Sequence, residues 1–432
     1  MGLALFISLI FLIVIGAPLC FALGGSAFVA ISGFSDLPGI LTVQKFFTGT
    51  DSFTLMAIPF FMISGSLMSK GGVSKRLIEL CNIFLKNFPG GLAIVTIVAC
   101  TFFGAISGSA PATAAAIGGI MIPAMLEQKY DSSFAMSTAA SGGYLGVIIP
   151  PSITMVTYGV AASVSIGDLF MAGIFPGILL CLGMSVYAFF VGKKNRYYQE
   201  RGVNEKYNSP SENLKKFLGA IPALLMPVII LGGIYGGIFT PTEAGCVAVI
   251  YGLIVGLFVY HELKLSDLPE ILKQSALSTS MIIFIIAAAT AFGNVMTREM
   301  IPNKVATFMT GISDNKIVFL LLVNILLLIV GCFMETNSAI MIIAPILLPV
   351  AKQLGVNPVH FGIIMVVNLA IGLLTPPLGM NLYVASGIAN KKVSDMFSKY
   401  LIGYIVVSVA VLMVITYIPA VSTFLPGVLS NR

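Results

Sequence analysis

Two pairs of consecutive prolines interrupt long apolar stretches of this sequence. Gly146–Ser152 reads GVIIPPS, and Gly372–Leu378 reads GLLTPPL. Proline lacks a backbone N–H and pushes the preceding residue out of the helical region, so each pair predicts a broken helix. The pairs stand 226 positions apart, from Pro150 to Pro376, and the same shift superposes the glycines that open the two stretches.

The composition places these breaks inside a membrane. Of 432 residues, 58% are hydrophobic and 9% are charged, which excludes an ordinary soluble globular protein. Uncharged stretches repeatedly exceed the roughly 20 residues that a spanning helix needs, and we expect about ten to twelve crossings. The first of these, Met1–Leu23, is expected to be one spanning helix. In lipid, a broken helix persists only where protein, water or an ion satisfies its freed carbonyls.

A second pair of motifs extends the repeat. GSLMSK at Gly65–Lys70 and GNVMTR at Gly293–Arg298 align at a shift of 228 positions. We therefore predict an internal duplication, with residues 1–192 as the first copy and 217–432 as the second. The connection, residues 193–216, is polar and rich in lysine and arginine, so it is expected in the cytoplasm.

Each copy is expected to contain a helical hairpin followed by a broken helix. In the first copy, small residues in FFGAISGSAPATAAAIGG predict a hairpin over residues 91–126 that turns at Ser107–Pro111, although close packing through small residues is an alternative. The second hairpin, over residues 318–352, has Glu335, Thr336 and Asn337 at its tip. The broken helices are expected over residues 135–165 and 360–390.

The sequence offers no enzyme constellation. A Ser/His/Asp set, HExxH, CxxC and a phosphate loop are all missing, and the six cysteines are read as packing residues. His261 and His360 are expected at the membrane interface. The net charge of +6 concerns topology and does not indicate a nucleic-acid partner. Glu243, in FTPTEAG, is expected to cap a helix in preference to binding an ion.

Sodium requires no titratable ligand, because unwound carbonyls and hydroxyls can supply its oxygens. The duplication then predicts two equivalent cation sites. The first comprises Ala105, Ser107, Gly108, Gly146, Ile149 and Ser152, and the second comprises Gly331, Glu335, Gly372, Thr375 and Leu378.

A polar cavity between these sites would suit an anionic solute near half-helix N-termini. Its expected lining is Ser107, Ser109, Ser152, Thr154, Thr336, Asn337 and Asn381. The alternative is that these polar groups only satisfy the broken helices.

Taken together, FFGAISGSAPATAAAIG, GVIIPPS, FTPTEAG, FMETNSA and GLLTPPLGMNLYV resemble the large membrane subunit of tripartite ATP-independent periplasmic (TRAP) transporters over essentially the whole chain. The resemblance implies two inverted repeats in an elevator-type fold of the ion-transporter superfamily, with both hairpins in a mobile domain. It also implies sodium-driven import across the bacterial inner membrane. Glu335 stands where aspartate is more often expected.

The resemblance implies two partners: a small four-helix membrane subunit, expected as a separate chain, and a periplasmic substrate-binding protein. Sialic acids, slightly favoured, and C4-dicarboxylates are the substrate classes that it implies. The alternative is a permease or channel that works alone, coupled to protons or passive. Import without a soluble partner that stops at equilibrium would favour this alternative.

Overall fold

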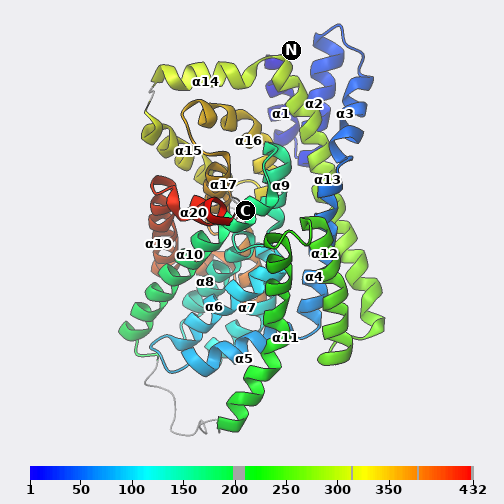
Figure 1. Cartoon of the computed structure of the whole chain (residues 1–432). Helices are drawn as coiled ribbons and strands as arrows, with labels where there is room; N and C mark the ends of the chain where they lie inside the picture. The colour runs from blue at the N-terminus through cyan, green and yellow to red at the C-terminus, as the bar shows by residue number, and fades with distance from the viewer. Residues whose placement is uncertain (198–209, 313–314, 377–378, 430–432) are drawn as a thin grey trace.

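The computed structural model describes residues 1–197, 210–312, 315–376 and 379–429, and every regular element in these ranges is a helix (Figure 1). Leu378 lies outside the described residues. Seven of the described helices are long and apolar enough to cross a membrane, and seven shorter apolar helices accompany them. The chain is therefore an all-α, multi-pass membrane protein.

The N-terminal apolar stretch is two helices, so the prediction of a single span over Met1–Leu23 is wrong. Gly16 has a left-handed backbone (φ +82°), and Pro18 precedes the second helix. The first-half helices are α1 (Gly2–Val14), α2 (Leu19–Phe34), α3 (Ile40–Thr50), α4 (Ala57–Lys70), α5 (Val73–Leu85), α6 (Gly91–Ser107), α7 (Ala110–Glu127), α8 (Ser132–Gly143), α9 (Ile153–Ala162) and α10 (Ile166–Lys194).

The second half repeats the helix lengths of the first around its hairpin. Helix α16 begins and ends 226 positions after α7, and α18 and α9 are both 10 residues long. The second-half helices are α11 (Pro210–Tyr235), α12 (Pro241–Ile254), α13 (Leu268–Arg298), α14 (Ile301–Ile312), α15 (Lys316–Gly331), α16 (Thr336–Gln353), α17 (Pro358–Gly372), α18 (Met380–Ala389), α19 (Lys399–Tyr417) and α20 (Ala420–Leu429).

The hairpin of each half packs against the broken helix of the other. Helix α7 contacts α18, and α16 contacts α9. Thr157 on α9 donates a hydrogen bond to Asn337 Oδ1 on α16 (3.1 Å). Reciprocal contacts of this kind are what a pseudo-twofold relation between two copies requires, and the inverted relation stays a prediction that they support.

Two matching amphipathic helices lie at opposite ends of the molecule. Val73, the first residue of α5, and Ile301, the first residue of α14, are 228 positions apart. Figure 1 shows α14 lying across the upper end and α5 at the lower end, beside the start of α11. Each follows a helix that begins before the hairpin of its half (α4 or α13), so each joins that helix to one hairpin.

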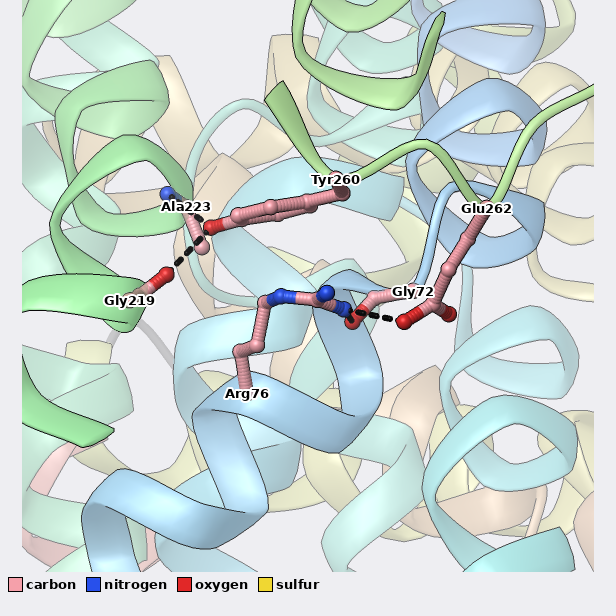
Figure 2. Close-up of polar contacts among 6 residues, drawn as sticks. All are labelled: Gly72, Arg76, Gly219, Ala223, Tyr260 and Glu262. Carbon is pink, nitrogen blue, oxygen red and sulfur yellow. Dashed lines mark hydrogen bonds and ion pairs between the residues drawn. The ribbon is translucent and has the colours of Figure 1, made fainter. Parts of the chain in front are cut away.

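A polar cluster fastens α5 to its surroundings (Figure 2). The Arg76 guanidinium lies 3.8 Å from the centre of the Tyr260 ring and forms a 2.6 Å ion pair with Glu262. It also donates to the Gly72 carbonyl (2.9 Å), while the Tyr260 hydroxyl donates to the Gly219 carbonyl (2.8 Å). Burial raises the pKa of Tyr260 to about 12, so the phenol keeps its proton as a donor. The start of α5 is thereby tied to α11 and to the loop after α12.

His360 does not face the membrane interface, contrary to the prediction. It is 1% exposed, and its ring contacts Ser422 Oγ (2.7 Å) and the Thr416 carbonyl (3.2 Å). The helices after α18 fold back over α17 and enclose this histidine, which the local sequence cannot show.

Candidate functional site

The first hairpin turns at Gly108. Its backbone is left-handed (φ +61°), which glycine adopts without steric cost, and α7 begins two residues later. The Gly108 carbonyl accepts a hydrogen bond from the Ile153 N–H (3.3 Å). The tip of the hairpin is thereby held against the start of α9, as the predicted first cation site requires.

Thr113 organises this tip, and the sequence reasoning missed it. Its hydroxyl lies 2.7 Å from Ser107 Oγ and donates to the Ser109 carbonyl (2.8 Å). Gly146 packs against the same group, because a methyl at this glycine would collide with Thr113 Oγ1 and lie 2.6 Å from the Ser109 carbonyl oxygen. The sequence did contain a signal for this role, because Thr113 carries a hydroxyl one helical turn after Ser109 in the predicted tip.

The first proline pair frees two carbonyls. In a continuing helix, the Gly146 and Val147 carbonyls would accept from residues 150 and 151, which are prolines. Val147 O instead accepts from the Ser152 hydroxyl (2.6 Å), which also caps α9 by accepting from the Met155 N–H (3.2 Å). The Gly146 carbonyl is left as a candidate ligand.

The second region repeats this design with different groups. Gly331 packs against Gly372, so that a Cβ on Gly331 would lie 3.0 Å from Gly372 Cα. The Leu373 carbonyl, 226 positions after Val147, accepts from the Asn381 N–H (3.3 Å). Thr375 donates its hydroxyl proton to the Ile371 carbonyl (3.2 Å).

Glu335 brings a carboxylate to the second tip. One carboxylate oxygen accepts from the Ser338 N–H (3.1 Å), and the other accepts from the Asn337 side-chain amide (2.7 Å). Glu335 therefore caps α16, and the cap holds the carboxylate beside the cavity described next.

Four helix N-termini meet around a central cavity of about 100 Å³. They are the first turns of α7, α9, α16 and α18. The lining comprises Met62, Gly108, Ser109, Ala110, Pro111, Val147, Ile153, Thr154, Ile282, Glu335, Thr336, Asn337, Leu373 and Met380. Because a helix N-terminus presents unpaired N–H groups and a partial positive charge, this arrangement favours an anion.

The predicted substrate residues divide into three groups. Ser109, Thr154, Thr336 and Asn337 line the central cavity, while Ser107 lines a neighbouring cavity. Ser152 and Asn381 line neither. Their ligand roles stay predictions.

Asn381 is fully buried and donates to the Ala140 carbonyl (3.0 Å). Its Oδ1 has no hydrogen-bond partner among the described residues. This amide therefore fixes α18 against α8, and its side-chain oxygen is buried without a partner among the described residues.

Both predicted sites offer oxygen groups of the kind that sodium takes, and sodium binding itself stays a prediction. The first offers the Gly146 carbonyl with the hydroxyls of Ser107, Thr113 and Ser152, and the second offers Thr375 and the Glu335 carboxylate. Carbonyl, hydroxyl and carboxylate oxygens are the ligands that hard cations take. Among the described residues, no group of three or more His, Cys, Asp or Glu side chains could hold a metal ion.

The predicted role of Glu243 as a helix cap is confirmed. It forms a capping box with Thr240, whose N–H donates to the carboxylate (2.8 Å) at the start of α12. It does not line the central cavity.

The family model described as "Tripartite ATP-independent periplasmic transporter, DctM component" matches residues 6–421. The chain belongs to the DctM family. It is 48% identical over 419 residues to the isethionate TRAP transporter permease protein DctMQ of Oleidesulfovibrio alaskensis, covering 96% of this chain and 65% of that protein. The chain thus spans 65% of the length of that relative.

Two further DctM relatives resemble it over more of their length. The C4-dicarboxylate TRAP transporter large permease DctM of Pseudomonas aeruginosa is 44% identical, covering 89% of this chain and 88% of that protein. The sialic acid large permease SiaM of Vibrio cholerae is 40% identical, covering 80% of each. All three names denote transporter permeases and none denotes an enzyme.

A solved structure shares the fold. The crystal structure of the Alcanivorax borkumensis YdaH transporter, described as having an unusual topology, aligns with a TM-score of 0.62 over 87% of each chain at 15% identity. This likeness concerns the fold alone.

Proposed function

We propose that this DctM-family chain imports a small organic anion across the bacterial inner membrane, driven by sodium. The observation that carries the proposal is the convergence of four helix N-termini on one cavity. Their combined partial charges attract an anion, while the Glu335 carboxylate in the same lining needs a compensating cation. An anion and a cation that balance each other in one low-dielectric site would bind cooperatively, which is the basis of coupling.

The size of the cavity favours a compact substrate. About 100 Å³ suits an anion of two to four carbons better than a nine-carbon sialic acid. The relatives named for isethionate and for C4-dicarboxylates agree with this size. We therefore favour a small carboxylate or sulfonate over the sialic acid that the resemblance slightly favoured.

Transport would proceed by an elevator movement of both hairpins with their broken helices. The reciprocal contacts of α7 with α18 and of α16 with α9 make these elements one packed unit. Helices α5 and α14, one at each end of the molecule, would join that unit to the remaining helices (Figure 1). The partners would be a small four-helix membrane subunit and a periplasmic binding protein that delivers the anion.

Reconstitution tests this function. The chain is placed in liposomes with its small subunit, its binding protein is supplied outside, and uptake of labelled isethionate or succinate is followed. We expect accumulation that requires an inward sodium gradient and the binding protein. Uptake that ignores sodium and follows pH would reject sodium coupling, and uptake that needs no binding protein and stops at equilibrium would favour a permease or channel working alone.

A further inference from the structure

A second cavity, of about 420 Å³, lies beside the central one between α4, α7 and α13. Both cavities are lined by Met62 and Ser109, so they adjoin. We call the second cavity the vestibule. Its lining comprises Met62, Gly65, Ser66, Ser69, Lys70, Ser107, Ser109, Ala112, Ala115, Ala116, Glu270, Ile271 and Gln274. Lys70 ends α4 and Glu270 lies in the first turn of α13, so the vestibule reaches the end of the molecule at which α5 and the start of α11 lie (Figure 1). We place this end on the cytoplasmic side, because the basic connection that leads into α11, residues 193–216, is predicted to be cytoplasmic.

The charges of the vestibule are unequally satisfied. Glu270 accepts a hydrogen bond from the Gln274 amide (2.8 Å) and lies 3.9 Å from the Lys273 ammonium. Lys70 is exposed and forms no ion pair within the described part of the chain. The Gln274 amide is neutral, but Lys273 offsets the charge of Glu270, so Lys70, Glu270 and Lys273 together carry a net charge of +1 (+1 − 1 + 1). The unpaired Lys70 therefore leaves a positive potential in this cavity.

Hydroxyl groups line the same vestibule as this cation. Ser66 accepts a hydrogen bond from Ser275 (3.3 Å) and keeps its own proton for another acceptor. The Ser69 and Ser109 hydroxyls have no hydrogen-bond partner among the described residues and can also donate. One ammonium with several hydroxyl donors suits a carboxylate or sulfonate group.

We infer that the vestibule is a second, weaker anion site, at which Lys70 and the neighbouring hydroxyls bind the carboxylate or sulfonate of the solute on its way between the central cavity and the cytoplasm. This inference rests on the proposed function. Exposure of Lys70 to water keeps the site weak, which suits release, because a solvated charge attracts its partner only modestly. Lys70 thus sets the affinity of the inner face and not that of the central cavity.

The test measures each face separately. In the reconstituted complex, exchange of labelled succinate or isethionate is recorded while the unlabelled anion is varied on one side only. Replacing Lys70 with glutamine should raise the half-saturating concentration at the inner face about fivefold, as expected for one solvated charge, and leave the outer value unchanged. Added salt should weaken inner-face affinity of the wild type more than that of the variant, because exposed charges are screened.

Two variants complete the test. Lys70→Arg keeps the charge and should restore most of the inner-face affinity, while Lys75→Gln removes a nearby exposed cation of α5 and should behave as the wild type. Equal inner-face affinities of the wild type and Lys70→Gln, or equal shifts at both faces, would overturn the inference. A wild-type complex that transports neither anion would overturn the proposed function instead, and the inference with it.

Discussion

The two halves of the molecule share a backbone design but differ in charge. Helices α7 and α16 have identical lengths 226 positions apart, and each follows an interrupting residue at a hairpin tip. In the first half this residue is the neutral Ser109, and in the second it is Glu335, which faces the central cavity. The comparison indicates that the helix breaks leave oxygen-rich regions in both halves, and that only the second tip carries a carboxylate, which would compensate the charge of the proposed cation directly.

The packing that the two halves share should be most sensitive to substitution at the glycines where two helices meet. Gly372→Val should abolish transport or reduce it at least about tenfold, because overpacking a tight contact costs roughly 1–3 kcal/mol. A Cβ at Gly372 would collide with the Gly331 backbone, which cannot move aside as a flexible side chain can. Transport rate and the yield of monodisperse protein measure the effect.

The matched control is Gly119→Ala on α7, where a Cβ would meet nothing within 4 Å. It should leave both measurements unchanged. Normal transport by Gly372→Val would show that the second half does not need the close helix approach that Gly104 and Gly146 make in the first.

The difference between the halves is tested by removing the charge of Glu335. Glu335→Gln keeps an acceptor for the Ser338 N–H but loses the carboxylate, so the sodium concentration for half-maximal uptake should rise about tenfold, as for loss of a charged contact. Sodium titration of uptake measures it. Glu243→Gln, which alters a cap outside the cavity, is the control, and an unshifted sodium titration in Glu335→Gln would exclude the carboxylate from the cation site.

In the neutral half, we expect hydroxyl groups to take the place of the carboxylate as cation ligands. Thr113→Val removes the hydroxyl that contacts Ser107 and the Ser109 carbonyl. The sodium concentration for half-maximal uptake should then rise about fivefold, as expected for the loss of one hydrogen-bonding group. Thr375→Val in the second half should raise this sodium concentration by a similar or smaller factor, because the Glu335 carboxylate remains. A larger rise for Thr375→Val than for Thr113→Val would show that the second half depends more on its hydroxyl than the first.

The sequence was informative where backbone chemistry decides the structure. Proline pairs have no N–H to donate, so the breaks after α8 and α17 were predictable, as was the first tip with Gly108 in left-handed geometry. The Thr240–Glu243 capping box follows from local spacing in the same way.

What the sequence could not show depends on packing between distant segments. Ser152 and Asn381 are predicted substrate ligands, and only the packing shows that one also caps α9 and that the other donates to the Ala140 carbonyl. The ring of His360 contacts Thr416 and Ser422, which follow it by 56 and 62 positions, so its burial depends on how α19 and α20 fold back. The role of Thr113 at the first tip depends on its contact with Gly146, which is 33 positions away in the sequence.

The smallest expected effect concerns how each amphipathic helix is fastened. Arg76 on α5 pairs with Glu262 and stacks on Tyr260, whereas Lys304, 228 positions later on α14, has no ion pair in the described ranges. Arg76→Gln should lower the free energy of unfolding by about 1 kcal/mol or less, because the pair is partly exposed. Lys304→Gln should change nothing, and thermal unfolding in detergent at low and high salt measures both. Equal destabilisation by the two changes would show that Lys304 holds α14 in place as Arg76 holds α5, so that the two halves do not differ in this respect.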